Sequence, residues 1–87
     1  MPDVFIWYHA DDIQEGVFQA WIHELERTNV CKGKLYKRQQ DEKTTFMEVF
    51  EHIDSATMKK IEQLATQQHC FQGIHRQCES FERILPL

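Results

Sequence analysis

The sequence predicts an α+β domain with the element order βαββαβ, and three observations favour this order. Four short segments are rich in β-branched and aromatic residues, two segments between them carry apolar residues at helical spacing, and turn or capping residues separate the six. The chain has 87 residues, a length typical of one domain, so residues 1–87 are expected to form a single unit with one modest core.

The first strand and the first helix follow from local pattern. Asp3 to His9 is predicted as a strand because it contains five consecutive β-branched or aromatic residues. Asp11 or Asp12 then begins a helix that extends to about Thr28, with Asn29 as a left-handed C-cap. This helix is expected to carry one apolar stripe, formed by Ile13, Val17, Phe18, Trp21, Ile22 and Leu25.

The second half of the chain supplies the other four elements. Residues 31–40 form a polar, basic strand, and a turn at residues 40–43 joins it in a hairpin to a third strand at residues 44–52. Asp54 caps the second helix, which frays near residues 67–69, and the last strand spans about residues 75–84. The apolar face of the second helix comprises Met58, Ile61, Leu64 and Ala65.

This order of elements is that of the ferredoxin-like fold, a four-stranded antiparallel sheet with two helices on one face. The first and third strands of that fold lie in the middle of the sheet. Residues 4–8 and 46–50 are largely apolar on both faces, as expected of central strands, whereas the second and fourth strands are polar, as expected of edges.

Alternation along the strands divides the sheet into an aliphatic face and an aromatic face. We assign the aliphatic set to the helix side: Val4, Ile6, Leu35, Met47 and Val49. The second set mixes aromatic and ionisable residues and is assigned to an uncovered face: Phe5, Trp7, His9, Tyr36, Arg38, Phe46, Glu48, Phe50 and His52. A monomer rarely leaves such a patch exposed, so we expect a homodimer whose interface contains Phe5, Trp7, Phe46 and Phe50.

Three segments, residues 4–9, residues 35–38 and Phe46-Met47-Glu48-Val49-Phe50-Glu51, resemble those of a small family of uncharacterised bacterial proteins. That family is similar to the dimeric α+β barrel superfamily. The resemblance implies a ferredoxin-like subunit whose open sheet packs against the sheet of a partner to form a barrel. The superfamily includes cofactor-independent monooxygenases, lactone isomerases and haem-degrading enzymes, and the resemblance implies no particular activity among them.

A cavity inside such a barrel would hold a candidate ligand pocket formed by Trp7, His9, Tyr36, Arg38, Glu48, Phe50 and His52. His9 or Glu48 could act there as a general base, and Arg38 could hold a carboxylate or an enolate-like oxygen. The structural alternative is an ion pair between Arg38 and Glu48. Two functions therefore stay open: a homodimeric interaction or small-ligand-binding protein, and a cofactor-independent enzyme of the monooxygenase or isomerase type.

An RNA-binding sheet platform is a further alternative, because RNA-recognition modules share this element order and stack bases on aromatic residues of strands one and three. Phe5, Phe46 and Phe50 fit that arrangement coarsely. The third strand lacks the glycine typical of the module, however, and Glu48 interrupts it. The net charge of −4 and the pI of about 5.7 also disfavour nucleic acid as a partner.

Other classes of chemistry find little support in the sequence. His69, Cys70, His75 and Cys78 fall within ten residues, but their irregular spacing is not that of a zinc site, so we expect no metal and no cofactor. The cysteines are three in number and do not suggest a disulfide framework. With no signal-peptide pattern and no apolar run of membrane-spanning length, the expected location is the cytoplasm.

Overall fold

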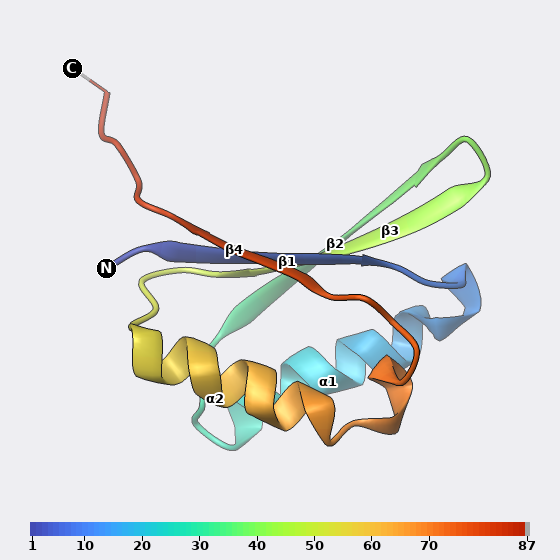
Figure 1. Ribbon diagram of the computed structural model, residues 1–87, viewed down its shortest axis with the longest axis horizontal. Coiled ribbons are helices and arrows are strands. Elements are labelled where there is room, and N and C mark those ends of the chain that lie inside the picture. The colour runs from blue at the N-terminus through green and yellow to red at the C-terminus, as the bar shows by residue number, and fades with distance from the viewer. Residues whose placement is uncertain (87) are drawn as a thin grey trace.

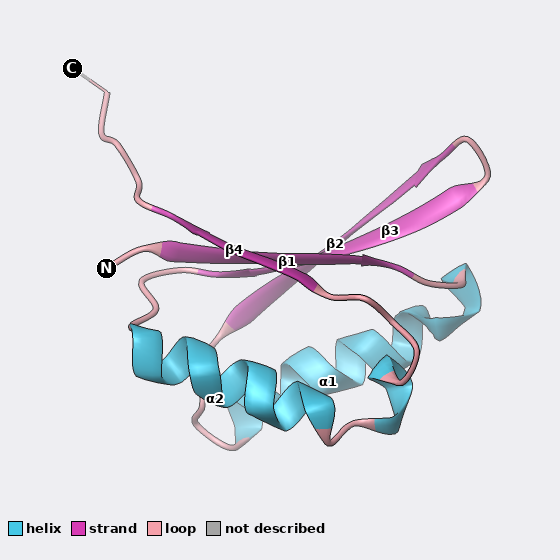
Figure 2. Ribbon diagram, viewed as in Figure 1, coloured by secondary structure: helices cyan, strands magenta, loops and turns pink. Residues whose placement is uncertain are grey.

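The fold is described by a computed structural model that covers residues 1–86. Its elements are β1 (Asp3–His9), η1 (Asp12–Gln14), α1 (Glu15–Arg27), β2 (Gly33–Gln40), β3 (Lys43–Phe50), α2 (Ser55–Thr66), η2 (His69–Phe71) and β4 (Gln77–Phe81), where η marks a 3-10 turn. The four strands form one antiparallel sheet in the order β2-β3-β1-β4. Both helices lie on one side of this sheet, and no helix of residues 1–86 lies on the other side (Figures 1 and 2). The predicted ferredoxin-like fold is therefore confirmed.

The second helix begins where its capping residue indicated, whereas Asp11 caps the 3-10 turn η1 and α1 begins only at Glu15. The Asp11 carboxylate accepts a hydrogen bond from the backbone N–H of Ile13, and the Asp54 carboxylate accepts one from the backbone N–H of Thr57. Asn29 has a φ of 59°, the left-handed conformation expected just after the end of α1. The apolar stripe of α1 was predicted partly wrongly, because η1 precedes the helix and alters the phase. Ile13 is 85% exposed and Val17 is 48% exposed, whereas the four later stripe residues are buried.

The β2–β3 hairpin closes through a tight turn in which Asp41 and Glu42 both have positive φ angles, of 53° and 63°. Two such residues form the type I′ turn that matches the twist of the flanking strands. Gly33 begins β2 opposite Phe50, and a side chain at this position would overlap the Phe50 ring. The glycine therefore allows the edge strand to approach a bulky core residue.

The core lies between the sheet and the two helices. β1 contributes Val4, Ile6 and Tyr8, and the register pairs them with Phe50, Glu48 and Phe46 of β3. All six residues are buried, so the assignment of the β3 faces from the sequence was inverted. Aromatic rings fill much of this space: the rings of Tyr8, Phe18, Phe46 and Phe71 pack with centroids 4.9–6.1 Å apart.

None of the helices within residues 1–86 has the length and the apolar character needed to cross a membrane.

Candidate binding site on the open face of the sheet

The side of the sheet that no described helix covers, here called the open face, carries rows of side chains that run across all four strands. One row consists of Lys34, Val49, Phe5 and Glu79, as the strand registers show. The next row consists of Tyr36, Met47, Trp7 and Gln77, and a third, incomplete row consists of Arg38, Thr45 and His9. Phe81, at the end of β4, adds a ring whose centroid is 5.8 Å from that of Phe5.

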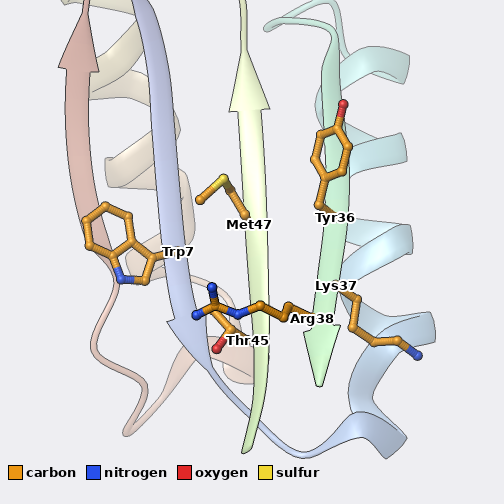
Figure 3. A pocket seen from close by; sticks show the side chains of 6 residues that line it. All are labelled: Trp7, Tyr36, Lys37, Arg38, Thr45 and Met47. Carbon is orange, nitrogen blue, oxygen red and sulfur yellow. The ribbon is translucent and has the colours of Figure 1, made fainter. Parts of the chain in front are cut away.

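A groove of about 460 Å³ occupies the end of this face nearest the β2–β3 hairpin. Figure 3 shows Met47 and Thr45 on its floor, with Trp7 on one side and Tyr36 on the other. The Arg38 side chain extends from β2 across β3 toward Trp7, so its guanidinium lies over the floor (Figure 3). The arrangement combines two aromatic side chains, an apolar floor and one cation.

The structure brings together three of the seven residues predicted to line a pocket: Trp7, Tyr36 and Arg38. His9 lies on the same face, beyond the groove, with its Nδ1 3.0 Å from the Thr45 hydroxyl. The Thr45 and Met47 side chains, which the prediction omitted, form the floor instead.

Of the other five residues predicted for the pocket or the interface, Phe5 lies on the open face and four lie elsewhere. Phe46, Glu48 and Phe50 are fully buried on the helix side, so they cannot line the open face or an interface formed by it. His52 follows β3 in a loop, where its φ is 54° and its backbone N–H donates to the Asp3 carboxylate. Phe50 ends β3, two residues short of the predicted end, which is why His52 does not continue the alternation.

A buried ionic network surrounds Glu48 on the helix side. Arg76 donates two parallel hydrogen bonds to the two Glu48 oxygens, at 2.9 and 3.0 Å, and a third to Glu62 at 3.0 Å. The Tyr8 hydroxyl donates to Glu48 Oε2 at 2.6 Å. The guanidinium carbon lies 4.2 Å from the centroid of the Phe71 ring. Glu48 is thus neutralised inside the chain, and the predicted pairing of Glu48 with Arg38 was wrong because the sheet separates the two.

The role of Arg76 was not predicted from the sequence. Arg76 lies in the segment between η2 and β4, and 28 positions separate it from Glu48. The only sequence signal for it was a general one: a carboxylate within an otherwise apolar central strand needs a buried cation, and an arginine can serve two carboxylates at once.

Burial and the neighbouring charges set the protonation states within this network. Burial, followed by the negative charge of Glu48, raises the pKa of Tyr8 above its ordinary 10.0, so the phenol remains a hydrogen-bond donor. Burial alone would lower the pKa of Arg76, but its hydrogen bonds and charge contacts with Glu48 and Glu62 raise it. Both raised pKa values keep Tyr8 and Arg76 protonated at neutral pH, as their hydrogen bonds to Glu48 require.

The histidines and cysteines of the C-terminal third do not converge. His69 and Cys70 line a separate hollow of about 540 Å³ between α1 and η2, together with Trp21. Cys78 lies on β4, opposite Ile6 in the sheet. Within residues 1–86, no three or more histidine, cysteine or acidic side chains come close enough together to hold a metal ion.

Cys31, just before β2, provides a pH-dependent readout of the fold. Burial, with a smaller contribution from the Glu48 charge, raises its pKa from 9.0 to about 11. Because the folded state holds the proton more tightly, the thiol contributes stability that is fully present below about pH 9 and is lost as the pH rises through about 11. In a folded Cys70→Ser/Cys78→Ser variant, we expect the alkylation rate of Cys31 to rise with pH and to reach half of its maximum near pH 11.

The same variant in urea is the control for this measurement, and its midpoint should lie near the ordinary thiol value of 9.0. A midpoint of the folded protein at or below that of the urea-unfolded protein would contradict the burial of Cys31.

Comparison with known proteins gives information on the fold and none on the site. No family model and no curated protein matches this chain. Among solved structures, the de novo designed protein Foldit4 is similar, with a TM-score of 0.73 at 11% identity over 95% of this chain and 98% of that one. PelD 156-455 from Pseudomonas aeruginosa PA14, solved in complex with c-di-GMP, has a TM-score of 0.59 at 9% identity. That match covers 94% of this chain but only 33% of the PelD chain. At these identities both likenesses concern the fold alone.

Proposed function

We propose that this chain is a self-association module that forms a two-fold homodimer through the open face of its sheet. The observation that carries the proposal is the composition of that face. Tyr36 and Phe81 are 54% and 56% exposed, and the partly exposed Phe5, Trp7, Met47 and Val49 lie between them. An apolar patch that spans four strands is typical of a surface that packs against another protein.

The order of side chains across the sheet supports a second copy as the partner. A two-fold axis parallel to the strands and between β3 and β1 would place β2 opposite the β4 strand of the partner, and β3 opposite its β1. In the row that contains Lys34 and Glu79, this arrangement places Lys34 of each chain opposite the partner's Glu79, so a basic and an acidic side chain face each other. The apolar pair of that row, Val49 and Phe5, would meet between them.

The enzyme and RNA alternatives lose residues on which they depended. Glu48 is the only carboxylate of the predicted pocket, and it lies on the helix side, so it is not available as a general base beside Arg38. The RNA interpretation relied on aromatic residues of the third strand, but Phe46 and Phe50 are buried. The open face of β3 instead carries Thr45, Met47 and Val49, none of which stacks bases.

Light scattering behind a sizing column tests the proposal. We expect a mass of two chains for the unaltered protein and of one chain for Val49→Glu, since the substitution places a charge at the centre of the interface. Ile13→Glu is the matched control, because Ile13 is an exposed apolar residue in η1, outside the sheet. It should keep the mass of two chains. A one-chain mass for the unaltered protein, or a two-chain mass for folded Val49→Glu, contradicts the proposal.

A charge-reversal pair tests the two-fold arrangement itself. Lys34→Glu and Glu79→Lys should each raise the dimer Kd, on the order of tenfold, and the double reversal should restore it. Lys34 also pairs with Glu51 of its own chain at 2.8 Å, so the recovery by the double variant, rather than the loss in either single one, is the decisive result.

A further inference from the structure

The groove on the open face is formed by one chain, and its chemistry differs from that of the rest of the face. It has a volume of about 460 Å³, within the roughly 300–1,000 Å³ typical of small-molecule sites. β4 pairs with β1 only from Asp3 to Trp7, so the row of Arg38, Thr45 and His9 has no β4 residue. In the two-fold arrangement proposed above, the partner's β4 strand would therefore end before it covers Arg38. The partner's Trp7 would lie over Met47, however, so a ligand and the partner sheet would compete for the floor of the groove.

Arg38 is the cation of β2 that has no acidic partner. Lys34 pairs with Glu51 at 2.8 Å, and Lys37 pairs with Asp12 and Glu15 at 2.9 and 2.6 Å. Within residues 1–86, no carboxylate lies within ion-pair distance of Arg38. Figure 3 shows its guanidinium over the floor of the groove, where it is free to donate hydrogen bonds to an anion.

The apolar floor of the groove and the aromatic side chains that flank it suit a flat apolar part of a ligand. Trp7 and Tyr36 both lie opposite Met47, one on each neighbouring strand, so their backbones are two strand spacings apart, about 9.6 Å. In Figure 3 the Trp7 indole extends from β1 toward β4 and the Tyr36 ring extends along β2, so the surface over Met47, between the two backbones, is left open to a planar ring. Aromatic rings and a methionine sulfur both make favourable contacts with a ligand ring.

We propose that this groove binds a small aromatic carboxylate, with its ring over Met47 between Trp7 and Tyr36 and its carboxylate on Arg38. The guanidinium can donate two parallel hydrogen bonds to the carboxylate, a geometry that an ammonium group does not offer. Thr45 lies at the same end of the groove, and its hydroxyl can donate a further bond when His9 Nδ1 is the donor in their shared hydrogen bond.

Binding of 2-naphthoate to the Val49→Glu chain, in which no partner sheet should cover the groove, tests this inference and is followed by calorimetry and by amide and indole NMR shifts. From the efficiency of ligands of this size we expect a Kd on the order of 1 mM. Neutral 2-naphthamide, which has the same ring, should bind about tenfold more weakly. The indole N–H resonance of Trp7 should shift, whereas that of Trp21, buried on the helix side, should not.

Arg38→Gln should weaken 2-naphthoate about tenfold, to the level of 2-naphthamide, and leave 2-naphthamide unchanged. Arg27→Gln is the matched control, since Arg27 lies on α1 and pairs with Glu24, away from the groove. Equal affinity for the acid and the amide, no loss of 2-naphthoate binding in Arg38→Gln, or no binding of either probe at 5 mM, a concentration about five times the expected Kd, would each overturn the inference.

The experiments distinguish a wrong groove assignment from a wrong dimer. Val49 does not line the groove, so the Val49→Glu chain should retain 2-naphthoate binding even when it is monomeric. Loss of the dimer with retained, Arg38-dependent binding leaves the groove assignment intact. Failure of the monomeric Val49→Glu chain to bind 2-naphthoate overturns the groove assignment and leaves the association unaffected.

Discussion

Replacing Arg76 with methionine is expected to lower the free energy of unfolding by about 3–5 kcal/mol. Methionine keeps much of the apolar stem, so the loss comes mainly from Glu48, whose fully buried carboxylate would lose two of its three hydrogen bonds. Urea denaturation at pH 7 and one fixed chain concentration measures the effect.

Two further variants separate the loss of an interaction from the cost of an unpaired charge. Arg27→Met breaks the exposed pair with Glu24 and should cost less than about 1 kcal/mol. The triple variant Tyr8→Phe/Glu48→Leu/Arg76→Met removes every buried polar group of the network and should recover most of the stability lost in Arg76→Met. If Arg76→Met costs no more than Arg27→Met, the buried network does not exist as described.

The network also explains how a strand can carry a carboxylate in the centre of the core. Glu48 lies on β3, Tyr8 on β1, Glu62 on α2, and Arg76 just before β4. The hydrogen bonds therefore connect four parts of the fold that are distant in sequence, and only one relative placement satisfies all of them. An apolar core of equal volume would hold these elements together but would specify their positions less strictly.

The positions of the elements could be predicted because each depends on neighbouring residues. β1 has the predicted bounds, Asp3–His9, since an unbroken run of strand-forming residues stands between polar ones. Asn29 and Asp54 act at the predicted helix ends, and Asp11 caps the 3-10 turn that precedes α1, because caps depend on local hydrogen bonds. The element order then determined the sheet, and hence the central position of β1 and β3.

The faces of β3 could not be predicted, because both are largely apolar. A slip of one residue in the assigned phase exchanges Phe46, Glu48 and Phe50 for Met47 and Val49. Glu48 was predicted to lie on the uncovered face of the sheet, because a carboxylate is usually exposed. What reverses that preference is Arg76, at a distance along the chain that no periodicity reveals. The prediction of the site was therefore half right. Its residues on β1 and β2 lie on the open face, whereas its residues on β3 lie on the opposite face of the sheet.

Alanine substitutions of Phe5 and Phe50 distinguish the face assignment made from the sequence from the one that the structure shows. Phe50→Ala should cost about 3–5 kcal/mol, because Phe50 is fully buried against the glycine at position 33 and the alanine would leave a cavity. Phe5→Ala removes the same side chain from the open face, where it is partly exposed and contacts Phe81, and should cost only about 1–2 kcal/mol.

Urea denaturation at equal chain concentration compares the two variants, with light scattering alongside to separate stability from association. Phe5→Ala should weaken self-association, because Phe5 lies in the row that would meet the partner's sheet. Phe50→Ala should leave association unchanged under conditions in which the variant is still folded. The face assignment from the sequence implies equal costs and equal effects on association, so similar values for the two variants would contradict the structure rather than the proposed dimer.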